Sequence, residues 1–368
     1  MILPKKRLFC ILLIPLSMLL TRLAHASPAA TERWFSMGVY RIFTETYGRV
    51  FGYLPFSVAQ FLIILLPVCG LLYVSYEIYL IARPRKWFDD QKPRKIYAIR
   101  LVANIACVAG IYWIMFTLLT GLNYARIEFG ETIGLDTRPS YVSELAALTE
   151  ILVAHANELS PQVTRNEYGH MIVSAASMTA LSRDARDIFR AAGDQWSVLR
   201  GYTPRAKPIL YSRLFSHMRI TGVFVPWTME AHVNVDVPHF HIPATMLHEL
   251  AHFRGIMRED EANFIAWLVG YHSGNVCFMY SGTMLALSYA AGQLSRHDRA
   301  EHTRIMGNLC YYVQLDRRAN WEYWQQFEGP LAEISQAAND AYLRAQRQQD
   351  GVLSYGRVVD LLLAYFRN

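Results

Sequence analysis

The chain has 368 residues, of which 53% are hydrophobic and 18% are charged, and its formal net charge is +6 at pH 7. This length allows a membrane region together with one globular domain, and the hydrophobic share exceeds that of an average soluble protein. The positive charge does not indicate a nucleic-acid partner, because much of it lies in one connector between apolar segments and no nucleic-acid-binding motif is present. We therefore expect a membrane protein that does not bind nucleic acid.

The first apolar run, residues 8–20, follows three basic residues and precedes Ala24-His25-Ala26. This order fits a cleavable signal peptide. It also fits a first transmembrane anchor that continues through Leu23, and Arg22 interrupts the run in a way that neither template favours. Residues 1–26 are expected to be one of these two.

Two further apolar stretches, residues 58–81 and 101–122, are each long enough to cross a bilayer as a helix. The connector of residues 82–100 is rich in Arg and Lys and contains only two acids, Asp89 and Asp90. Because basic connectors remain in the cytoplasm, this loop is predicted to be cytoplasmic and the chain after Leu122 to emerge on the other side. Residues 27–122 are thus expected to form a membrane region, and residues 123–368 an extracytoplasmic domain.

The outer region has the composition of a mixed soluble domain, with helical periodicity over residues 143–159, 171–192 and 330–347. Residues 218–238 instead alternate with period two, which predicts a β-hairpin up to Val237 with one polar face. Residues 262–295 contain no Asp, Glu, Lys or Arg, but Gly270 and residues 272–275 divide them into pieces too short to span a membrane. Two buried helices are expected there, with a re-entrant hairpin as the alternative. The expected fold class is α+β and mainly helical.

His248, Glu249 and His252 form an HExxH motif in a predicted helix that begins near Pro243 and ends near Gly255. Residues four apart lie on one face of a helix, so both imidazoles can bind one metal ion. Glu249 points to a different side of the helix, where it is suited to act as the general base on a water. Zinc is the expected cofactor, because it lowers the pKa of a bound water to near 7. The alternative is a helix whose histidines face solvent or ordinary core partners.

A zinc ion that keeps one position open needs a third protein ligand. Glu259, Asp260 and Glu261 follow Gly255, which can reverse the chain so that a second helix returns one carboxylate to the metal. Glu259 is the preferred ligand and Glu261 the second choice, while the alternative is that these acids only stabilise a helix N-terminus. Arg258 stands where one zincin clan has a third histidine, and arginine cannot bind zinc, so that clan is disfavoured.

Glu259-x-Glu261-Ala262-Asn263 resembles the E-x-E-A-[DN] element of gluzincin-type membrane peptidases, in which the first glutamate is the zinc ligand. The resemblance implies Glu259 as the ligand, although only six residues separate it from His252, fewer than in most gluzincins. Most of the chain also resembles a bacterial membrane family catalogued as domain-of-unknown-function family 3810, in residues 53–57, 220–226, 248–255 and 259–264. That family implies a zincin-like fold behind N-terminal membrane helices, in the bacterial cell membrane.

In zincins an edge strand beside the active helix pairs with extended substrate, and the predicted hairpin is the candidate here, with His232 or Asn234 facing the cleft. The alternative is a solvated polar face. A donor to a developing oxyanion is also needed. Four side chains are available, although buried Tyr and His more often serve packing and local hydrogen bonds: Tyr271, His272, Tyr280 and His239. Cys277 and Cys310 could pair in an oxidising compartment or remain buried thiols.

These features predict a membrane-anchored zinc metallopeptidase that hydrolyses peptide bonds in peptides or proteins near the membrane surface. The first alternative is a non-catalytic membrane protein with a structural zinc site, acting as a sensor or assembly module. Glu249 argues against it, since a structural site needs no general base. The second alternative is a transporter component, but Glu77 is the only acid in either long span and lies near its cytoplasmic end, which supports a conduction pathway poorly.

Overall fold

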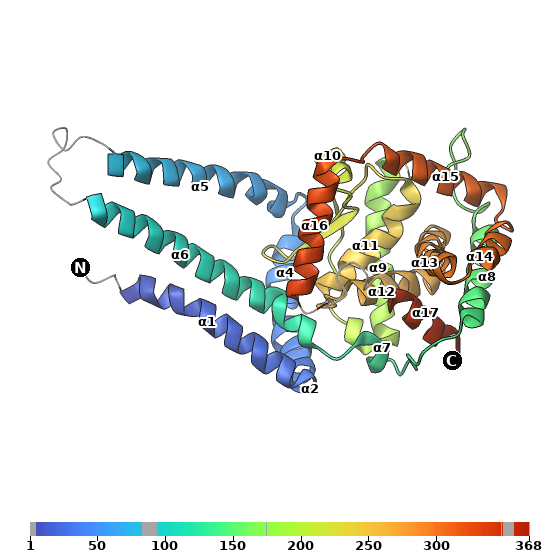
Figure 1. The fold of residues 1–368 in the computed structure, drawn as a ribbon, viewed down its shortest axis with the longest axis horizontal. Helices are drawn as coiled ribbons and strands as arrows, with labels where there is room; N and C mark the ends of the chain where they lie inside the picture. Colours follow the sequence, from blue (N-terminus) through green and yellow to red (C-terminus); the bar gives the residue numbers. More distant parts are fainter. Residues whose placement is uncertain (1–4, 83–93, 174, 347, 349–356, 368) are drawn as a thin grey trace.

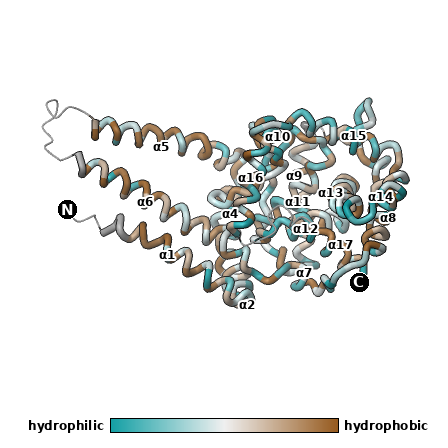
Figure 2. The backbone as a smooth tube through the Cα atoms, in the orientation of Figure 1, coloured by the Kyte–Doolittle hydropathy of each residue, from teal (hydrophilic) through white to brown (hydrophobic). Residues whose placement is uncertain are grey.

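Three long helices project from one side of a globular helical body in the computed structural model, which describes residues 5–82, 94–173, 175–346, 348 and 357–367 (Figure 1). These helices are α1 (Lys5–Ala26), α5 (Val58–Ala82) and α6 (Arg94–Leu119). By length and composition they can cross a membrane, over Phe9–Ala26, Val58–Ala82 and Ile96–Leu119, and Figure 2 shows their strong hydrophobicity. The long apolar helices are therefore confirmed, although the last candidate span is displaced toward the N-terminus from 101–122.

The last span ends earlier than expected because the chain leaves α6 and forms a 3-10 turn, η3 (Gly121–Ala125). The basic residues 83–93 of the predicted cytoplasmic connector lie outside the described part of the chain. In Figure 1, the N-terminal end of α1 and the ends of α5 and α6 that face this connector lie together, far from the body. That arrangement fits the predicted topology, which stays a prediction, as does cleavage after residue 26.

Close packing joins α1 to α6, and an ion pair joins α5 to α6. Gly110 of α6 lies against the backbone carbonyl of Cys10 in α1, where a Cβ atom could not fit. Glu77 of α5 is buried and lies 2.7 Å from Arg100 of α6. The acid in the span is thus neutralised within the helix pair, and it offers no free charge for conduction.

Residues 28–53, which we expected to belong to the membrane region, form short helices that pack against the body. These are α2 (Pro28–Ala30), the π-helix η1 (Thr31–Val39), α3 (Tyr40–Glu45) and α4 (Tyr47–Tyr53). Glu32 of η1 forms a two-point ion pair with the buried Arg126, with distances of 2.8 and 2.6 Å. The link between the first two apolar helices is therefore part of the folded domain.

The body is built around two consecutive buried helices, α12 (Glu259–Tyr271) and α13 (Val276–His297), which confirms the two-helix prediction for residues 262–295. They pack against α8 (Val142–Leu159), α11 (Ile242–Phe253) and α17 (Arg357–Arg367). The other elements are α7 (Phe129–Thr132), α9 (Ala175–Gln195), η4 (Ser197–Leu199), α10 (Ser212–His217), η5 (His239–His241), α14 (Arg299–Met306), α15 (Tyr311–Gln325) and α16 (Pro330–Ala345). The helices predicted over 143–159 and 330–347 are confirmed, whereas α9 begins only at Ala175 because Met171 pairs with Arg165 in a β-bridge.

A three-stranded sheet of order β1-β3-β2 supports one side of α11. It comprises β1 (Lys207–Pro208), β2 (Gly222–Val225) and β3 (Glu230–Val233), with β3 parallel to β1 and antiparallel to β2. The predicted hairpin is confirmed but shorter, since β3 ends at Val233 rather than Val237. All of β3 is buried, so the expectation of a solvated polar face is wrong. Among the described residues, β2 is the edge strand beside α11.

The two polar side chains expected to face a cleft lie elsewhere, because β3 is the central strand. His232 Nε2 lies 2.7 Å from the hydroxyl of Ser57, and the amide of Asn234 donates to Ser216 and to the carbonyl of Ile220. Both side chains therefore join segments inside the body. The prediction that either one contacts substrate is wrong.

The central strand also holds the start of α5. The carboxylate of Glu230 accepts hydrogen bonds from the backbone N–H groups of Val58 (3.1 Å) and Ala59 (2.7 Å). It also forms an ion pair with Lys207, at 2.6 Å. A carboxylate at a helix N-terminus is stabilised by the free N–H groups and the helix dipole. The sheet and the apolar helix α5 are thereby fixed to each other.

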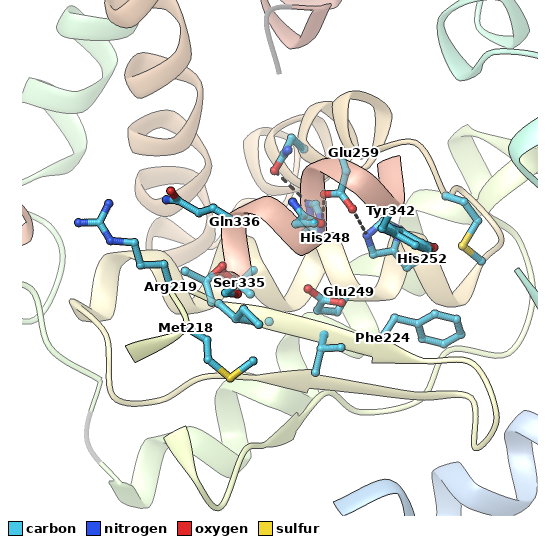
Figure 3. Close-up of a pocket in the computed structure, with 18 of the residues that line it drawn as sticks. Met218, Arg219, Phe224, His248, Glu249, His252, Glu259, Ser335, Gln336 and Tyr342 are labelled. Atoms are coloured by element: carbon cyan, nitrogen blue, oxygen red, sulfur yellow. Dashed lines mark hydrogen bonds and ion pairs between the residues drawn. The ribbon is translucent and has the colours of Figure 1, made fainter. Parts of the chain in front are cut away.

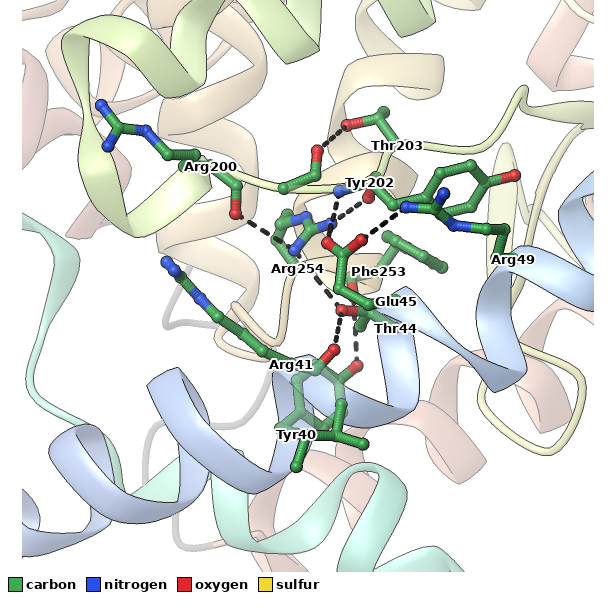
Figure 4. Close-up of polar contacts among 12 residues, drawn as sticks. Tyr40, Arg41, Thr44, Glu45, Arg49, Arg200, Tyr202, Thr203, Phe253 and Arg254 are labelled. Carbon is green, nitrogen blue, oxygen red and sulfur yellow. Dashed lines mark hydrogen bonds and ion pairs between the residues drawn. The ribbon is translucent and has the colours of Figure 1, made fainter.

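Arg254, directly after α11, fixes the other end of that helix to the short N-terminal helices (Figure 4). Its buried guanidinium donates to the carbonyl oxygens of Arg200 and Tyr202 and lies 3.6 Å from the carboxylate of Glu45. The hydroxyl of Tyr40 donates to the carbonyl of Phe253, at 3.2 Å. The C-terminal end of α11 is thus held by Tyr40 and Glu45 of α3 and by the backbone of residues 200–202.

We expect Arg254→Ala to lower the free energy of unfolding by about 3 kcal/mol, because it leaves buried carbonyl groups without donors. For a domain of this size, that loss lowers the unfolding midpoint by on the order of 10 °C in a thermal scan of the detergent-solubilised protein. The control is Arg213→Ala, which removes an exposed pair with Asp236 and should cost less than about 1 kcal/mol. Equal losses in both variants would contradict a role for Arg254 as an anchor.

Candidate metal centre

Helix α11 carries the HExxH motif and ends in a Schellman turn. Gly255 has a φ of +83°, its N–H donates to the carbonyl of His252 (2.9 Å), and the N–H of Ile256 donates to the carbonyl of Ala251 (3.1 Å). Helix α12 begins shortly afterwards at Glu259 and packs against α11. The tight reversal explains how a carboxylate so close in sequence to His252 can return to it.

His248 and His252 lie one turn apart on α11, and the first turn of α12 brings Glu259 to both of them (Figure 3). The carboxylate oxygens of Glu259 lie 3.4 Å from His248 Nε2 and 3.5 Å from His252 Nε2. One ligand atom of each residue lies within 4.8 Å of those of the other two. Two imidazoles and one carboxylate at this spacing fit a zinc site with an open fourth position.

The outer nitrogen of each imidazole has its own hydrogen-bond partner. His248 Nδ1 lies 3.0 Å from Asn263 Oδ1, and His252 Nδ1 lies 2.7 Å from the carbonyl oxygen of Ile256. Both partners are acceptors, so each Nδ1 carries the proton and each Nε2 is left with a lone pair for a metal. Asn263 lies one turn after Glu259 on α12, a spacing visible in the sequence although we assigned it no role there.

The charges of His248, His252 and Glu259, called the trio below, favour a cation between these three residues. Burial by itself would raise the pKa of Glu259, but hydrogen bonds with the two imidazoles hold that pKa well below its ordinary value. Burial acts to lower the pKa of His252, but the neighbouring Glu259 carboxylate raises it to about 9. The carboxylate therefore stays ionised and stabilises positive charge beside it, as the ligand of a divalent ion must.

Glu249 lies between α11 and the edge strand β2, on the cavity side of the histidine pair (Figure 3). A Cβ atom at Gly222 of β2 could not fit beside its Oε1, and its buried Oε2 has no hydrogen-bond partner in the described part of the chain. Burial raises the pKa of Glu249 to about 7, which His248 and His252 offset only in part. A buried carboxylate with a free oxygen is placed to accept a proton from a water in the cavity.

Glu261, the second choice for the third ligand, faces away from the trio. Its carboxylate accepts from the backbone N–H of Phe129 (2.7 Å) and pairs with Arg258 (3.0 Å). Asp260 pairs with Arg357 at 2.9 Å. Of the three acids at the start of α12, the fold therefore brings only Glu259 to the histidines.

The site opens into a cavity of about 910 Å³. The four residues predicted as oxyanion donors do not line it and are bound elsewhere: Tyr280 donates to Asp316, His239 accepts from the N–H of Val173, His272 bonds to Tyr365, and Tyr271 stacks on Trp267. That prediction is wrong, because none of the four side chains reaches the cavity. Cys277 and Cys310 are free thiols, so the expected alternative of a disulfide is not seen.

Tyr342 of α16, to which we assigned no role from the sequence, does line the cavity. Its hydroxyl lies 3.0 Å from that of Tyr124, which donates to it, and it lines the cavity with the metal trio. Burial raises the pKa of Tyr342 to about 12, and the Glu259 carboxylate adds to the increase. Tyr342 is therefore protonated at neutral pH and can donate a hydrogen bond. The local sequence carried no signal for it, since α16 begins more than 70 residues after the motif.

One family comparison includes the site and two of the three long apolar helices. The family described as "Protein of unknown function (DUF3810)" matches residues 35–363. The chain belongs to this family. The match begins within η1 and ends within α17, so it contains α5, α6 and the candidate metal centre. Neither the curated proteins nor the solved structures yield a match. The resemblance to this family is confirmed, and the gluzincin-like activity stays a prediction.

We expect Glu259→Gln to weaken zinc binding by more than about 100-fold, because the neutral amide loses the charge that holds the ion. Asn263→Ala should weaken it by about 10- to 100-fold, since His248 loses its orienting partner. Elemental analysis and competition with a chelator measure both effects. The control is Glu261→Gln, which should keep the metal, and loss of zinc from this variant alone would contradict the assignment.

Proposed function

We propose that this protein is a membrane-anchored zinc metallopeptidase, with zinc held by His248, His252 and Glu259. The observation that carries the proposal is the position of Glu249: a buried carboxylate with one free oxygen borders the same cavity as the three ligand atoms. A structural zinc site has no use for such a group. When bound, zinc supplies a polarised water that is a nucleophile at neutral pH and an electrophilic contact for a carbonyl oxygen.

Three parts of the chain would take different roles in peptide hydrolysis: Glu249, Tyr342 and the edge strand β2. Glu249 takes the proton of the attacking water and returns it to the nitrogen of the leaving amine, for which a carboxyl pKa near 7 is well matched. Tyr342 donates to the substrate oxygen as negative charge develops on it. The edge strand β2 supplies free backbone groups that can pair with an extended peptide.

The proposed location follows from the three long apolar helices and from the basic connector between α5 and α6. We propose that α5 and α6 cross the bacterial cell membrane with the connector in the cytoplasm and the catalytic body outside. Peptides or proteins near the extracytoplasmic surface of that membrane are then the accessible substrates.

The decisive variant is Glu249→Gln, which removes the base while keeping the shape of the side chain. We expect it to lower kcat by about 10²- to 10⁴-fold and to retain zinc. The assay uses the detergent-solubilised chain, a diverse library of soluble and membrane-anchored peptides, and elemental analysis of bound metal. The matched control is Glu158→Gln, at an exposed position of α8, which should behave as the wild type.

The pattern of results separates the alternatives. Absence of zinc from the wild-type protein would refute the proposal. Stoichiometric zinc with no cleavage of any peptide would favour a non-catalytic module with a structural zinc site.

Tyr342→Phe tests the second catalytic role. Because it removes only the hydroxyl donor, we expect kcat to fall by about 100-fold with little change in KM, as for loss of one oxyanion donor. Steady-state kinetics on the best library peptide measure the two constants separately. Tyr311→Phe, at an exposed tyrosine, is the control, and an increase in KM alone would indicate that Tyr342 only binds substrate.

A further inference from the structure

The cavity of the metal centre is bordered by the last turns of a candidate membrane span. Tyr112 and Phe116 of α6 lie within the apolar stretch Ile96–Leu119, and both line the cavity that contains His248 and Glu249. Tyr112 stacks on Trp227 with ring centroids 4.8 Å apart, and Phe116 contacts Tyr342 edge-on at 6.2 Å. The site therefore lies at the end of the span, where Tyr and Trp side chains also mark the boundary of a bilayer.

The edge strand β2 runs from the catalytic residues toward that boundary. Gly222 touches the carboxylate of Glu249, and the hairpin turn after Val225 leads to Trp227, which is stacked on α6. Gly222, Val223 and Phe224 of β2 all line the cavity although alternate side chains of a strand point to opposite faces, so the strand borders the cavity with its edge. A peptide paired with β2 would extend from the catalytic centre directly to the outer end of α6.

The opposite wall of the cavity is one face of α16. It presents Ser335, Asn339 and Tyr342 near the metal centre, and Leu331 and Ile334 are apolar lining residues that are 43% and 66% exposed. The cavity is thus lined by polar side chains and by two apolar surfaces, the start of α16 and the aromatic side chains at the end of α6. A water-soluble peptide would make little use of those apolar surfaces.

We propose that the substrate is a polypeptide anchored in the same bilayer by its own apolar helix, cut at a bond about five residues outside that helix. This inference rests on the proposed peptidase activity. The spacing follows from the chain itself, because Trp227 is the fifth residue after Gly222. The first three of these residues belong to the extended strand β2, and the last two lie in the turn that reaches α6. The aromatic wall of Tyr112, Phe116 and Trp227 receives the segment that emerges from the membrane, and β2 leads it to Glu249.

The test uses the full-length protein in lipid vesicles and one peptide sequence that the library assay shows to be cleaved. That sequence is attached to a 20-residue Leu/Ala helix through Gly/Ser spacers that place the scissile bond about 2, 5, 10 or 20 residues from the helix. The same sequence without the helix is the soluble control. We expect kcat/KM to be at least about ten-fold higher for the anchored peptide at the five-residue spacing than for the soluble peptide, and to decrease at the two longer spacings.

A maximum at the five-residue spacing, with less cleavage at two residues as well as at ten and twenty, is the decisive result, because local concentration alone would fall steadily as the spacer lengthens. Trp227→Ala should reduce the ratio of anchored to soluble cleavage at the five-residue spacing by several fold. Trp34→Ala removes an exposed tryptophan of η1 outside the cavity and should leave that ratio unchanged.

The outcomes separate this inference from the proposed function. Equal cleavage of the soluble and anchored peptides, or equal cleavage at all spacings, overturns the inference and leaves the peptidase intact. Cleavage that persists in Glu249→Gln, or no cleavage of any peptide, overturns both.

Discussion

The tight reversal between α11 and α12 is the constraint on which the candidate centre depends. It places the first turn of α12 against the histidine face of α11, so that Glu259 meets both Nε2 atoms while Asn263, one turn later, meets His248 Nδ1. The carbonyl of Ile256, inside the same turn, holds His252 Nδ1. A single short loop therefore positions the third ligand and both outer hydrogen bonds, and only a residue that tolerates positive φ, here Gly255, allows it.

The apolar helices are structurally continuous with this centre. Glu230 of the central strand caps α5, and Arg254 joins the end of α11 to α3. Arg126 pairs with Glu32 of η1. Buried pairs of this kind add little net stability but strongly oppose rearrangement, since breaking one leaves an uncompensated charge. The site is therefore held at a fixed height relative to the spans, as a domain on a flexible linker would not be.

The cavity is lined by two different kinds of side chain, carboxylates and aromatic rings. The carboxylates of Glu249 and Glu259 border the cavity together with the edge strand β2 and the side chain of Tyr342. The far wall, with Tyr112 and Trp227, is aromatic and reaches into the apolar helix α6. The cavity thus joins a polar region at the candidate metal centre to an aromatic region at the end of α6.

The local pattern was sufficient to predict the apolar helices, the HExxH helix, its glycine stop and the return of Glu259 to the two histidines, because each depends on spacing along one or two adjacent helices. Only the tertiary structure decided what depends on distant segments. It placed β3 in the middle of the sheet, which buried His232, and it brought Tyr342 rather than Tyr280 to the cavity. Periodicity reveals which face of an element is buried, but not which other element covers it, so contacts across the cavity could not be predicted.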